Sequence, residues 1–273
     1  RLARKIYLLF KRIIKKPLPN LTKIMIIMGF FLTLVQVNRV GGSVVANALS
    51  SIHKLTPAEI GVVIGVMFLS SALVQIPFGV MLDRFGARRM IVGWSSFAII
   101  GTVIFGLAET SLGLTVGRTF IGIGHGASIT GVYLLALAWA SPERVASVAA
   151  TTIAVAGALG GMIGTAPLAA SIQYVGFTDT FLYLAVVSLL SSILIWFFVD
   201  DKPPGARIEN TKENSKTAIL GLLEVIKDRN LWPIFAMALC FSVPFATIGG
   251  LWVGPFLRDI HGLSPTSAGS IIF

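Results

Sequence analysis

The sequence predicts an all-α integral membrane protein, and three observations lead to that fold class. Apolar residues make up 55% of the 273 residues, charged residues make up only 12%, and the mean hydropathy is +0.86. A soluble domain usually has about a quarter of its residues charged. The apolar residues fall in runs of about 20, which is the length that a helix needs to cross a bilayer. The Lys and Arg residues stand in blocks between these runs.

We expect seven membrane spans and the beginning of an eighth. The expected spans cover residues 24–50, 59–82, 90–108, 112–139, 146–171, 180–199 and 231–257, and the eighth begins near Pro265. Each complete span is close to or longer than about 20 residues. Before the second span, Thr56-Pro-Ala-Glu59 matches a capping box with Pro at the first helical position, which predicts where that helix starts.

The first 23 residues form a basic segment, which we expect to be cytoplasmic. They contain eight of the 22 Lys and Arg residues: Arg1, Arg4, Lys5, Lys11, Arg12, Lys15, Lys16 and Lys23. The basic stretch is too long for a signal peptide, and the apolar run after it has no cleavage pattern.

The distribution of positive charge predicts the orientation. With the N-terminus in the cytoplasm, 18 Lys and Arg residues fall in cytoplasmic segments and two, Lys54 and Arg258, fall in outer loops. Positive residues favour the cytoplasmic side, so we expect a multi-pass protein with a cytoplasmic N-terminus, in the inner membrane if the source is bacterial. Charge in such blocks, despite a net charge of +10, does not suggest a nucleic-acid partner.

Residues that would indicate an enzyme or a cofactor are missing from the expected spans. The single cysteine, Cys240, allows no intramolecular disulfide. His53, His125 and His261 lie far apart in the sequence, and we find no metal-ligand cluster, activated Ser or pair of carboxylates. We therefore expect no enzyme activity, no metal and no cofactor.

A change of composition marks a boundary between two bundles. Residues 200–230 contain Pro203-Pro204-Gly205, then mixed charges, then the mainly apolar stretch Ala-Ile-Leu-Gly-Leu-Leu-Glu-Val-Ile at 218–226. We expect a cytoplasmic linker with a short amphipathic helix on the membrane surface. It separates a six-helix bundle, 24–199, from the start of a C-terminal bundle, 231–273.

An internal repeat supports this division. Ile52-His-Lys-Leu-Thr-Pro57 corresponds to Ile260-His-Gly-Leu-Ser-Pro265 at an offset of 208 residues, and Gly41-Gly42 corresponds to Gly249-Gly250 at the same offset. Parallel halves of this kind predict a full length of roughly 400 residues. We therefore expect the chain to lack most of its C-terminal half and to be unable to transport alone.

The loop after the second span carries the most specific motif. It reads Gly-Val-Met-Leu-Asp-Arg-Phe-Gly-Ala-Arg-Arg over residues 79–89. This resembles the loop 2–3 signature of the major facilitator superfamily, except at Met81 and Ala87. The resemblance implies a cytoplasmic latch between the two halves, formed by Gly79, Asp83, Arg84, Gly86 and Arg88. The alternative is plain anchoring by positive charge.

Two further glycine-rich spans resemble the same family. The fourth span has Arg118 followed by glycines, although Ile121 replaces the usual Gln. The fifth span is rich in glycine but lacks the Gly-Pro pair of drug–proton antiporters, which disfavours drug export. The alternative role of these glycines is close helix packing without ligand contact.

The resemblance covers nearly the whole chain and implies a major-facilitator-type helical bundle. It implies a six-helix N-terminal half, span 7 and the start of span 8 of a presumed twelve-helix protein. In this fold spans 1, 4, 7 and 10 line a central cavity, and the missing C-terminal half is an expected partner within the same chain.

The candidate substrate-binding residues lie in the first and fourth spans. A charged side chain inside a span is costly, so it tends to face a cavity or a partner. His125 follows Arg118 by seven residues, about 20° from the same helix face. The candidates are Gln36, Arg39, Ser43, Arg118 and His125.

These residues predict the charge of the solute. Two Arg side chains with no acid deep in any span favour an anion. In the alternative, Arg118 binds backbone carbonyls at a break in a neighbouring helix and Arg39 extends toward the membrane surface.

The expected function is secondary transport of a small polar or anionic solute by alternating access, in contact with the lipid bilayer. The alternative is a transporter-like membrane sensor or scaffold that moves no solute. A cavity without polar lining would favour that alternative, and a vesicle transport assay would separate the two.

Overall fold

The computed structural model describes residues 20–126, 128–203, 225, 227–244, 247–248 and 252–272, with several side chains left out. The regular elements in these ranges are all helices. The first 19 residues of the expected basic segment, nearly all of the expected amphipathic helix at 218–226 and the pair Gly249-Gly250 lie outside the described residues.

The first six expected spans are confirmed as helices, and three of them consist of two helices in succession. The first span is α2 and α3, the second α4, the third α5, the fourth α6 and α7, the fifth α8 and α9, and the sixth α10. Their bounds are α2 Asn20–Val40, α3 Gly42–Ser51, α4 Pro57–Phe85, α5 Ala87–Leu107, α6 Ser111–His125, α7 Ser128–Trp139, α8 Val145–Gly164, α9 Ala166–Tyr174 and α10 Phe177–Phe198.

The helix boundaries have local causes. The capping box before α4 is present, because the Thr56 hydroxyl accepts from the Glu59 backbone N–H and the Glu59 carboxylate accepts from the Thr56 backbone N–H. The fifth span breaks at Thr165, and Pro167 lies in the first turn of α9, where a missing N–H costs no helical hydrogen bond. Gly86, at φ 84°, joins α4 to α5 in a conformation that favours glycine.

Six helical segments in the described part of the chain are long and apolar enough to cross a membrane: Asn20–Val40, Pro57–Gln75, Ala87–Leu107, Ser111–Trp139, Pro142–Tyr174 and Phe177–Phe198. Large apolar side chains such as Leu73, Leu137 and Phe197 are exposed on the bundle surface. An apolar exterior is the arrangement expected where lipid is the solvent.

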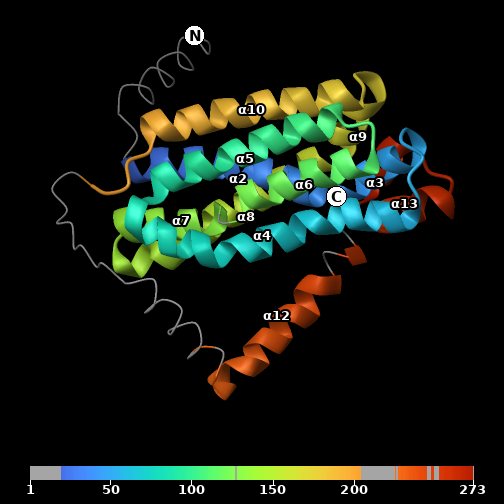
Figure 1. Cartoon of the computed structure of the whole chain (residues 1–273). Coiled ribbons are helices and arrows are strands. Elements are labelled where there is room, and N and C mark those ends of the chain that lie inside the picture. The colour runs from blue at the N-terminus through green and yellow to red at the C-terminus, as the bar shows by residue number, and fades with distance from the viewer. Residues whose placement is uncertain are drawn as a thin grey trace, which may run out of the picture.

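The spans form one bundle (Figure 1). Helix α2 packs against α8 and α10, and α6 packs against α4 and α5. Two apolar clusters fill the bundle, one around Met28, Phe31 and Leu135 and the other around Leu49, Phe105 and Phe181.

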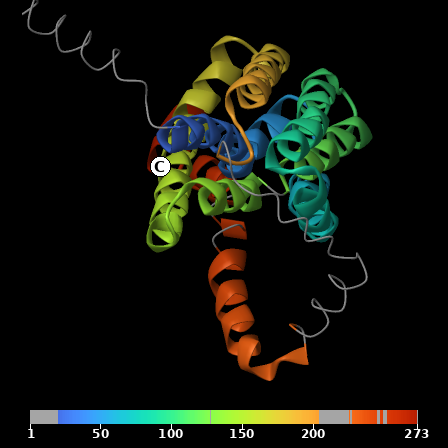
Figure 2. The ribbon, with the colours of Figure 1, turned by 90° about the vertical axis from the view of Figure 1, so that its left-hand side faces the viewer.

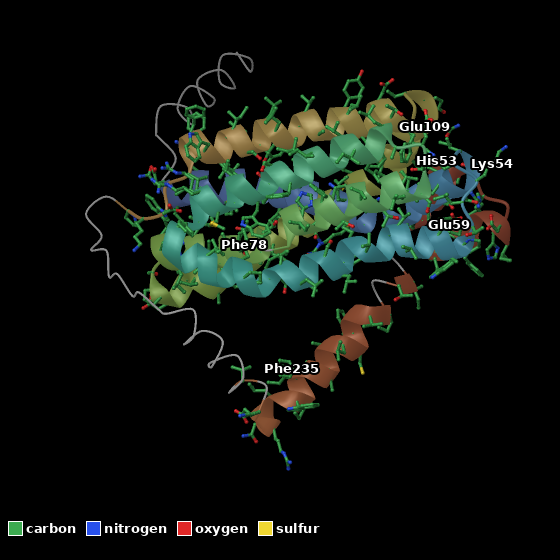
Figure 3. All side chains as sticks on the ribbon, in the orientation of Figure 1. His53, Lys54, Glu59, Phe78, Glu109 and Phe235 are labelled. Atoms are coloured by element: carbon green, nitrogen blue, oxygen red, sulfur yellow. The ribbon has the colours of Figure 1, made fainter. Side chains whose placement is uncertain are left out.

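The later α-helices with bounds in the described residues are α12 (Trp232–Pro244), α13 (Val253–Asp259) and α14 (Pro265–Ile272). Helix α13 packs on α3, and α14 packs mainly on α9. In both views α12 stands away from the bundle (Figures 1 and 2). At the end of the bundle opposite to the start of α2, short loops carry His53, Lys54 and Glu109, and Glu59 lies in the first turn of α4 (Figure 3).

Candidate functional site

Arg118, on α6, lies inside the bundle and is 1% exposed. Its Nη1 donates to the backbone carbonyl of Asn38 at 3.1 Å and contacts the Met67 sulfur at 3.4 Å. The guanidinium carbon lies 4.5 Å from the centre of the Phe105 ring, within the range of a cation–π interaction. Its Nε is buried without a hydrogen-bond partner among the described residues.

The partner carbonyl of Arg118 lies beside a helix break. Helix α2 ends at Val40 and α3 begins at Gly42. The last carbonyls of a helix lack a partner within that helix, so the carbonyl of Asn38 is available to an outside donor. This contact matches the alternative that the sequence left open for Arg118.

The orientation of Arg39 differs from the alternative left open for it, in which its side chain extends toward the membrane surface. It is partly exposed, and its Nη2 lies 3.4 Å from the Ser71 hydroxyl of α4. The side chain therefore reaches across to a neighbouring span within the bundle. The contact is long for a hydrogen bond, and the described residues offer the other donors of the guanidinium no hydrogen-bond partner.

His125 ends α6 and is 5% exposed. Its ring meets the Phe31 ring edge-on, with 6.2 Å between the centroids. It lies about two turns along α6 from Arg118, and its Nδ1 is buried without a described hydrogen-bond partner. The structure thus brings three of the five sequence candidates into one region, which we call the basic cluster: Arg39, Arg118 and His125.

Gln36 and Ser43 have other neighbours. Gln36 packs closely against Gly160 of α8. A Cβ added at Gly160 would overlap the Cβ of Gln36. Ser43 is completely buried, and a Cβ added at Gly254 of α13 would lie 2.8 Å from its carbonyl oxygen. These two candidates contact spans 5 and 7 in this structure.

Several polar residues beside the basic cluster were not predicted. Asn38 and Asn47 are buried on the first span, and the Oδ1 atom of each lacks a described hydrogen-bond partner. Ser71 of α4 contacts Arg39. Asn38 and Asn47 could have been noticed as amides within an apolar run, whereas nothing in the sequence pairs Ser71 with Arg39.

Several glycines of spans 4 and 5 allow close helix packing, whereas Gly161 of α8 has no described atom within 4 Å of an added Cβ. A Cβ at Gly117 would lie 2.7 Å from the backbone nitrogen of Phe105, and one at Gly164 would lie 3.2 Å from the Cα of Val37. At Gly117 any side chain would force α5 and α6 apart, and at Gly164 the neighbouring backbone of α2 would have to shift by a few tenths of an ångström. Gly79 differs, because no described atom lies within 4 Å of a Cβ placed there.

The loop between α4 and α5 is tied to the end of α10. The backbone N–H of Arg88 donates to Asp201 Oδ1 at 2.6 Å, and Arg88 Nη1 lies 3.2 Å from Asp200 Oδ1. A Cβ at Gly86 would lie 2.5 Å from Asp201 Oδ2. The backbones of Asp83 and Arg84 belong to α4, but their side chains lie outside the described residues.

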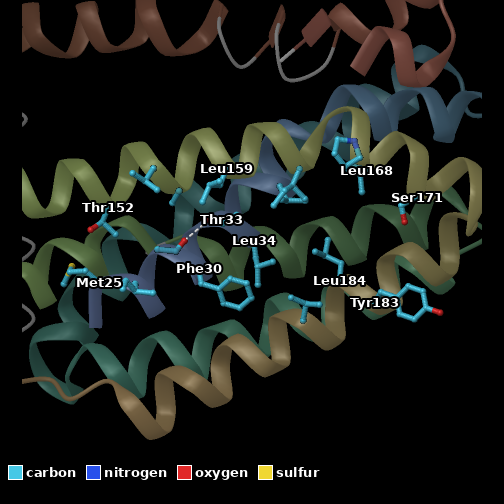
Figure 4. Close-up of a pocket in the computed structure, with 18 of the residues that line it drawn as sticks. Met25, Phe30, Thr33, Leu34, Thr152, Leu159, Leu168, Ser171, Tyr183 and Leu184 are labelled. Carbon is cyan, nitrogen blue, oxygen red and sulfur yellow. Dashed lines mark hydrogen bonds between the residues drawn. The ribbon is translucent and has the colours of Figure 1, made fainter. Parts of the chain in front are cut away.

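An apolar groove on the molecule is separate from the basic cluster. It runs between α2, α8, α9 and α10, has a volume of about 740 Å³ and is mainly apolar (Figure 4). Arg39, Arg118 and His125 do not line it. A polar solute needs hydrogen-bonding partners, so the basic cluster is the better candidate for solute binding.

Comparisons with known proteins agree with this architecture. An uncharacterized transporter of Buchnera aphidicola subsp. Acyrthosiphon pisum is 32% identical over 206 residues, which cover 74% of this chain and 52% of that protein. A probable sulfoacetate transporter of Cupriavidus necator is 29% identical over 167 residues, 61% of this chain and 39% of that protein. The chain spans about half or less of the length of these relatives.

A crystal structure with the same fold is that of a bacterial homolog of the human lysosomal transporter Spinster, in an inward-facing and unoccupied conformation. The TM-score is 0.72 at 18% identity, and the match covers 93% of this chain and 59% of that one. The model of the Major Facilitator Superfamily matches residues 24–273. Together with the six spans and their packing, this match places the chain in the Major Facilitator Superfamily.

Proposed function

We propose that the chain is part of a secondary transporter that carries a small organic anion by alternating access. Residues 24–199 form the first bundle, 200–230 a cytoplasmic linker and 231–273 the start of the second bundle. The six spans and the transporter names of the relatives support transport. The charge balance of residues 1–23 and of the loops supports a cytoplasmic N-terminus.

The basic cluster is the observation that carries the choice of an anion. Arg39, Arg118 and His125 lie together inside the bundle. The described acidic side chains lie near helix ends or in loops: Glu59, Glu109, Glu143, Asp179, Asp200, Asp201, Asp228 and Asp259. Two guanidinium groups without a counter-ion in a medium of low dielectric attract an anion strongly.

Arg39 and Arg118 have different roles in this proposal. The Arg39 guanidinium has unused donors and is partly exposed, so it binds the anion directly. Arg118 is fully buried and bonded to Asn38, so it adds long-range positive charge and holds the break in the first span. His125 supplies a ring nitrogen from the same helix face as Arg118.

The packing of span 7 supports a conformation closed at the outer end. Arg258 Nη1 of α13 donates to the Asn47 carbonyl of α3 at 3.3 Å, and Gly254 packs against Ser43. At the other end α12 diverges from the bundle (Figure 1). Alternating access requires the contact between α3 and α13 to break when the outer end opens.

The loop at residues 79–88 acts as a latch in the transport cycle in this proposal. Arg88 joins the start of α5 to Asp200 and Asp201 after α10, which fixes the loop to the end of the first bundle. Arg88 therefore positions the loop in this proposal, and Gly79, Asp83, Arg84 and Gly86 complete the latch motif.

Transport is tested with the full-length protein in proteoliposomes. Matched anionic, neutral and cationic solutes of similar size are offered outside, with empty liposomes as the control. The proposal expects saturable uptake of at least one small organic anion. A protein that binds solutes but moves none into the vesicles would be a sensor, and the proposal would be wrong.

A further inference from the structure

His53 lies in the loop after α3, and one of its ring nitrogens is shielded from water. The Nε2 atom is buried and has no hydrogen-bond partner among the described residues. The His53 ring meets the Phe177 ring at the start of α10 edge-on, with 5.1 Å between the centroids. This environment suits the neutral ring better than the charged ring, because only one nitrogen of a neutral imidazole carries a hydrogen.

Protonation changes what the His53 ring requires from its surroundings. Both nitrogens of the charged ring are donors, and a buried N–H without an acceptor is costly. The charged ring therefore has to turn its Nε2 toward water or toward a carboxylate. Either movement alters the edge-on contact with Phe177. Phe177 is itself buried in close packing, so a displacement of its ring also shifts the rings that it touches.

Glu109, in the loop between α5 and α6, is an acidic group that favours the charged His53 ring. Burial lowers the pKa of His53 from 6.5, and the Glu109 carboxylate opposes this shift. The balance of these two effects sets the pH at which His53 takes up a proton.

Other titratable side chains lie at the same end of the described helices. The charged ones are Lys54, Glu59, Asp179, Arg258 and Asp259, and the others are Tyr174, Tyr183 and His261. The Glu59 carboxylate already accepts from Thr56, and Arg258 pairs with Asp259. A test of His53 therefore has to separate its proton from those of its neighbours.

Phenylalanine rings connect His53 to Arg118 of the basic cluster. The Phe177 ring lies 5.4 Å from the Phe105 ring, and the Phe181 ring lies 4.8 Å from each of them. All three rings are buried. The Arg118 guanidinium carbon lies 4.5 Å from the centre of the Phe105 ring. A chain of packed side chains of this kind is a physical route for coupling between two sites.

We propose that His53 is a proton-binding site that is coupled to Arg118 through Phe177 and Phe105. A proton taken up at His53 displaces the Phe177 ring, and the displacement reaches the Phe105 ring that contacts the Arg118 guanidinium. With the N-terminus in the cytoplasm, this proton comes from the outer side of the membrane. The coupling involves residues of the first bundle and does not depend on the solute that is transported.

The internal repeat supplies a matched control. His261 corresponds to His53 at the offset of 208 residues, and its ring also meets a phenylalanine edge-on, at 5.3 Å from Phe256. Phe256 is 52% exposed, and the ring contacts of the described residues do not continue from it to Phe105. A proton at His261 should therefore leave the Phe105 ring undisturbed.

The test is fluorine NMR of the full-length protein in micelles, with 4-fluorophenylalanine as the probe at Phe105. The pH is varied from about 8 to about 5, the usual titration range of histidine, and histidine NMR gives the midpoint for His53. The proposal expects the fluorine resonance to shift with that midpoint. His53→Gln should abolish the shift, and His261→Gln should preserve it. Phe177→Leu should let His53 titrate without moving the fluorine resonance.

A second probe and three contrary outcomes keep the test decisive. If the protein labelled at Phe105 does not elute as a single species, the fluorine is placed at Phe181, which touches the same two rings. An unchanged pH-dependent shift in His53→Gln overturns the proposal, because another group is then its source. A fixed resonance while His53 titrates, or a His53 that takes up no proton in this range, overturns it as well. These outcomes are independent of transport, so they leave the proposed function untouched.

Discussion

Arg118 and Arg39 illustrate how two similar residues in neighbouring spans acquire different environments. The sequence marks both as charges inside spans, which predicts that they face a cavity or a partner. The sequence could not show which Arg meets a partner and which stays exposed. That outcome depends on which backbone carbonyl lies near α6 at the helix break at Gly41. The structure places Arg118 on that carbonyl and leaves Arg39 partly exposed.

Arg118→Gln should therefore destabilise the protein more than Arg39→Gln. The first change leaves the Asn38 carbonyl unpaired in the interior, which costs about 1–3 kcal/mol. The second removes only a long contact to Ser71. Thermal unfolding in detergent compares the two variants with the unmodified protein. Equal loss of stability in both would contradict the separate roles.

His53 in the outer loop gives a second prediction for a single residue. Partial burial lowers the pKa of His53 from its ordinary value of 6.5, and the Glu109 carboxylate opposes this shift. Because the pKa is lower in the folded protein, the contribution of His53 to stability is present above pH 6.5 and is lost as the pH falls below it. Glu109→Gln removes the opposing charge and should lower the pKa further. Histidine NMR in micelles measures the pKa of His53 in the unmodified protein and in Glu109→Gln. A titration midpoint above 6.5 in the unmodified protein would contradict the prediction.

Helices were predictable as elements because apolar run length and capping residues are local signals. The six spans and the start of α4 at Pro57 follow from such signals. The break at Thr165 was not predicted, although Pro167 marks it, because a proline alone does not end a membrane helix. The attachment of α5 to the end of α10 depends on residues more than 100 positions apart.

The attachment of α5 to the end of α10 predicts that substitutions of two neighbouring acidic residues have unequal effects on stability. Asp201 accepts the backbone N–H of Arg88 at the start of α5, where a helix favours negative charge, so Asp201→Ala should cost about 1 kcal/mol. Asp200 is 72% exposed and pairs only with a side chain, so Asp200→Ala should cost less than about 0.5 kcal/mol. Thermal unfolding in detergent measures both changes. The reverse order would mean that the side-chain ion pair dominates the attachment.

The contact between α3 and α13 predicts a conformational response. In Gly254→Val the new Cβ would lie 2.8 Å from the Ser43 carbonyl oxygen, which is too close, so the outer ends of spans 1 and 7 should separate. In a Cys240→Ala background, Ser43→Cys should then react faster with a membrane-impermeant maleimide added outside. Gly161→Val, at an open position on α8, is the control. No increase in labelling with Gly254→Val would argue that this contact does not keep the outer end closed.

At the scale of the whole molecule, the bundle combines an apolar exterior with a mainly apolar interior that holds a few polar side chains. Large apolar side chains such as Leu73 and Phe197 face outward, while Arg118, His125 and Asn38 lie within. The resemblance of the sequence to the major facilitator superfamily predicted the overall architecture, and the family match confirms it. The sequence could identify only some residues of the candidate binding site. Which side chains meet there depends on how the helices pack against each other.

The central claim is that the positive interior binds an anion, and the affinity of the full-length protein for its solute tests it most directly. Isothermal titration in detergent with the transported anion compares the unmodified protein with Arg39→Gln and Arg118→Gln, after each variant has been checked for folding. The account predicts that Arg39→Gln weakens binding by about tenfold or more, because a charge-assisted hydrogen bond contributes about 1.5–3 kcal/mol. Wild-type affinity in both variants, or a solute that proves to be a cation, would contradict it.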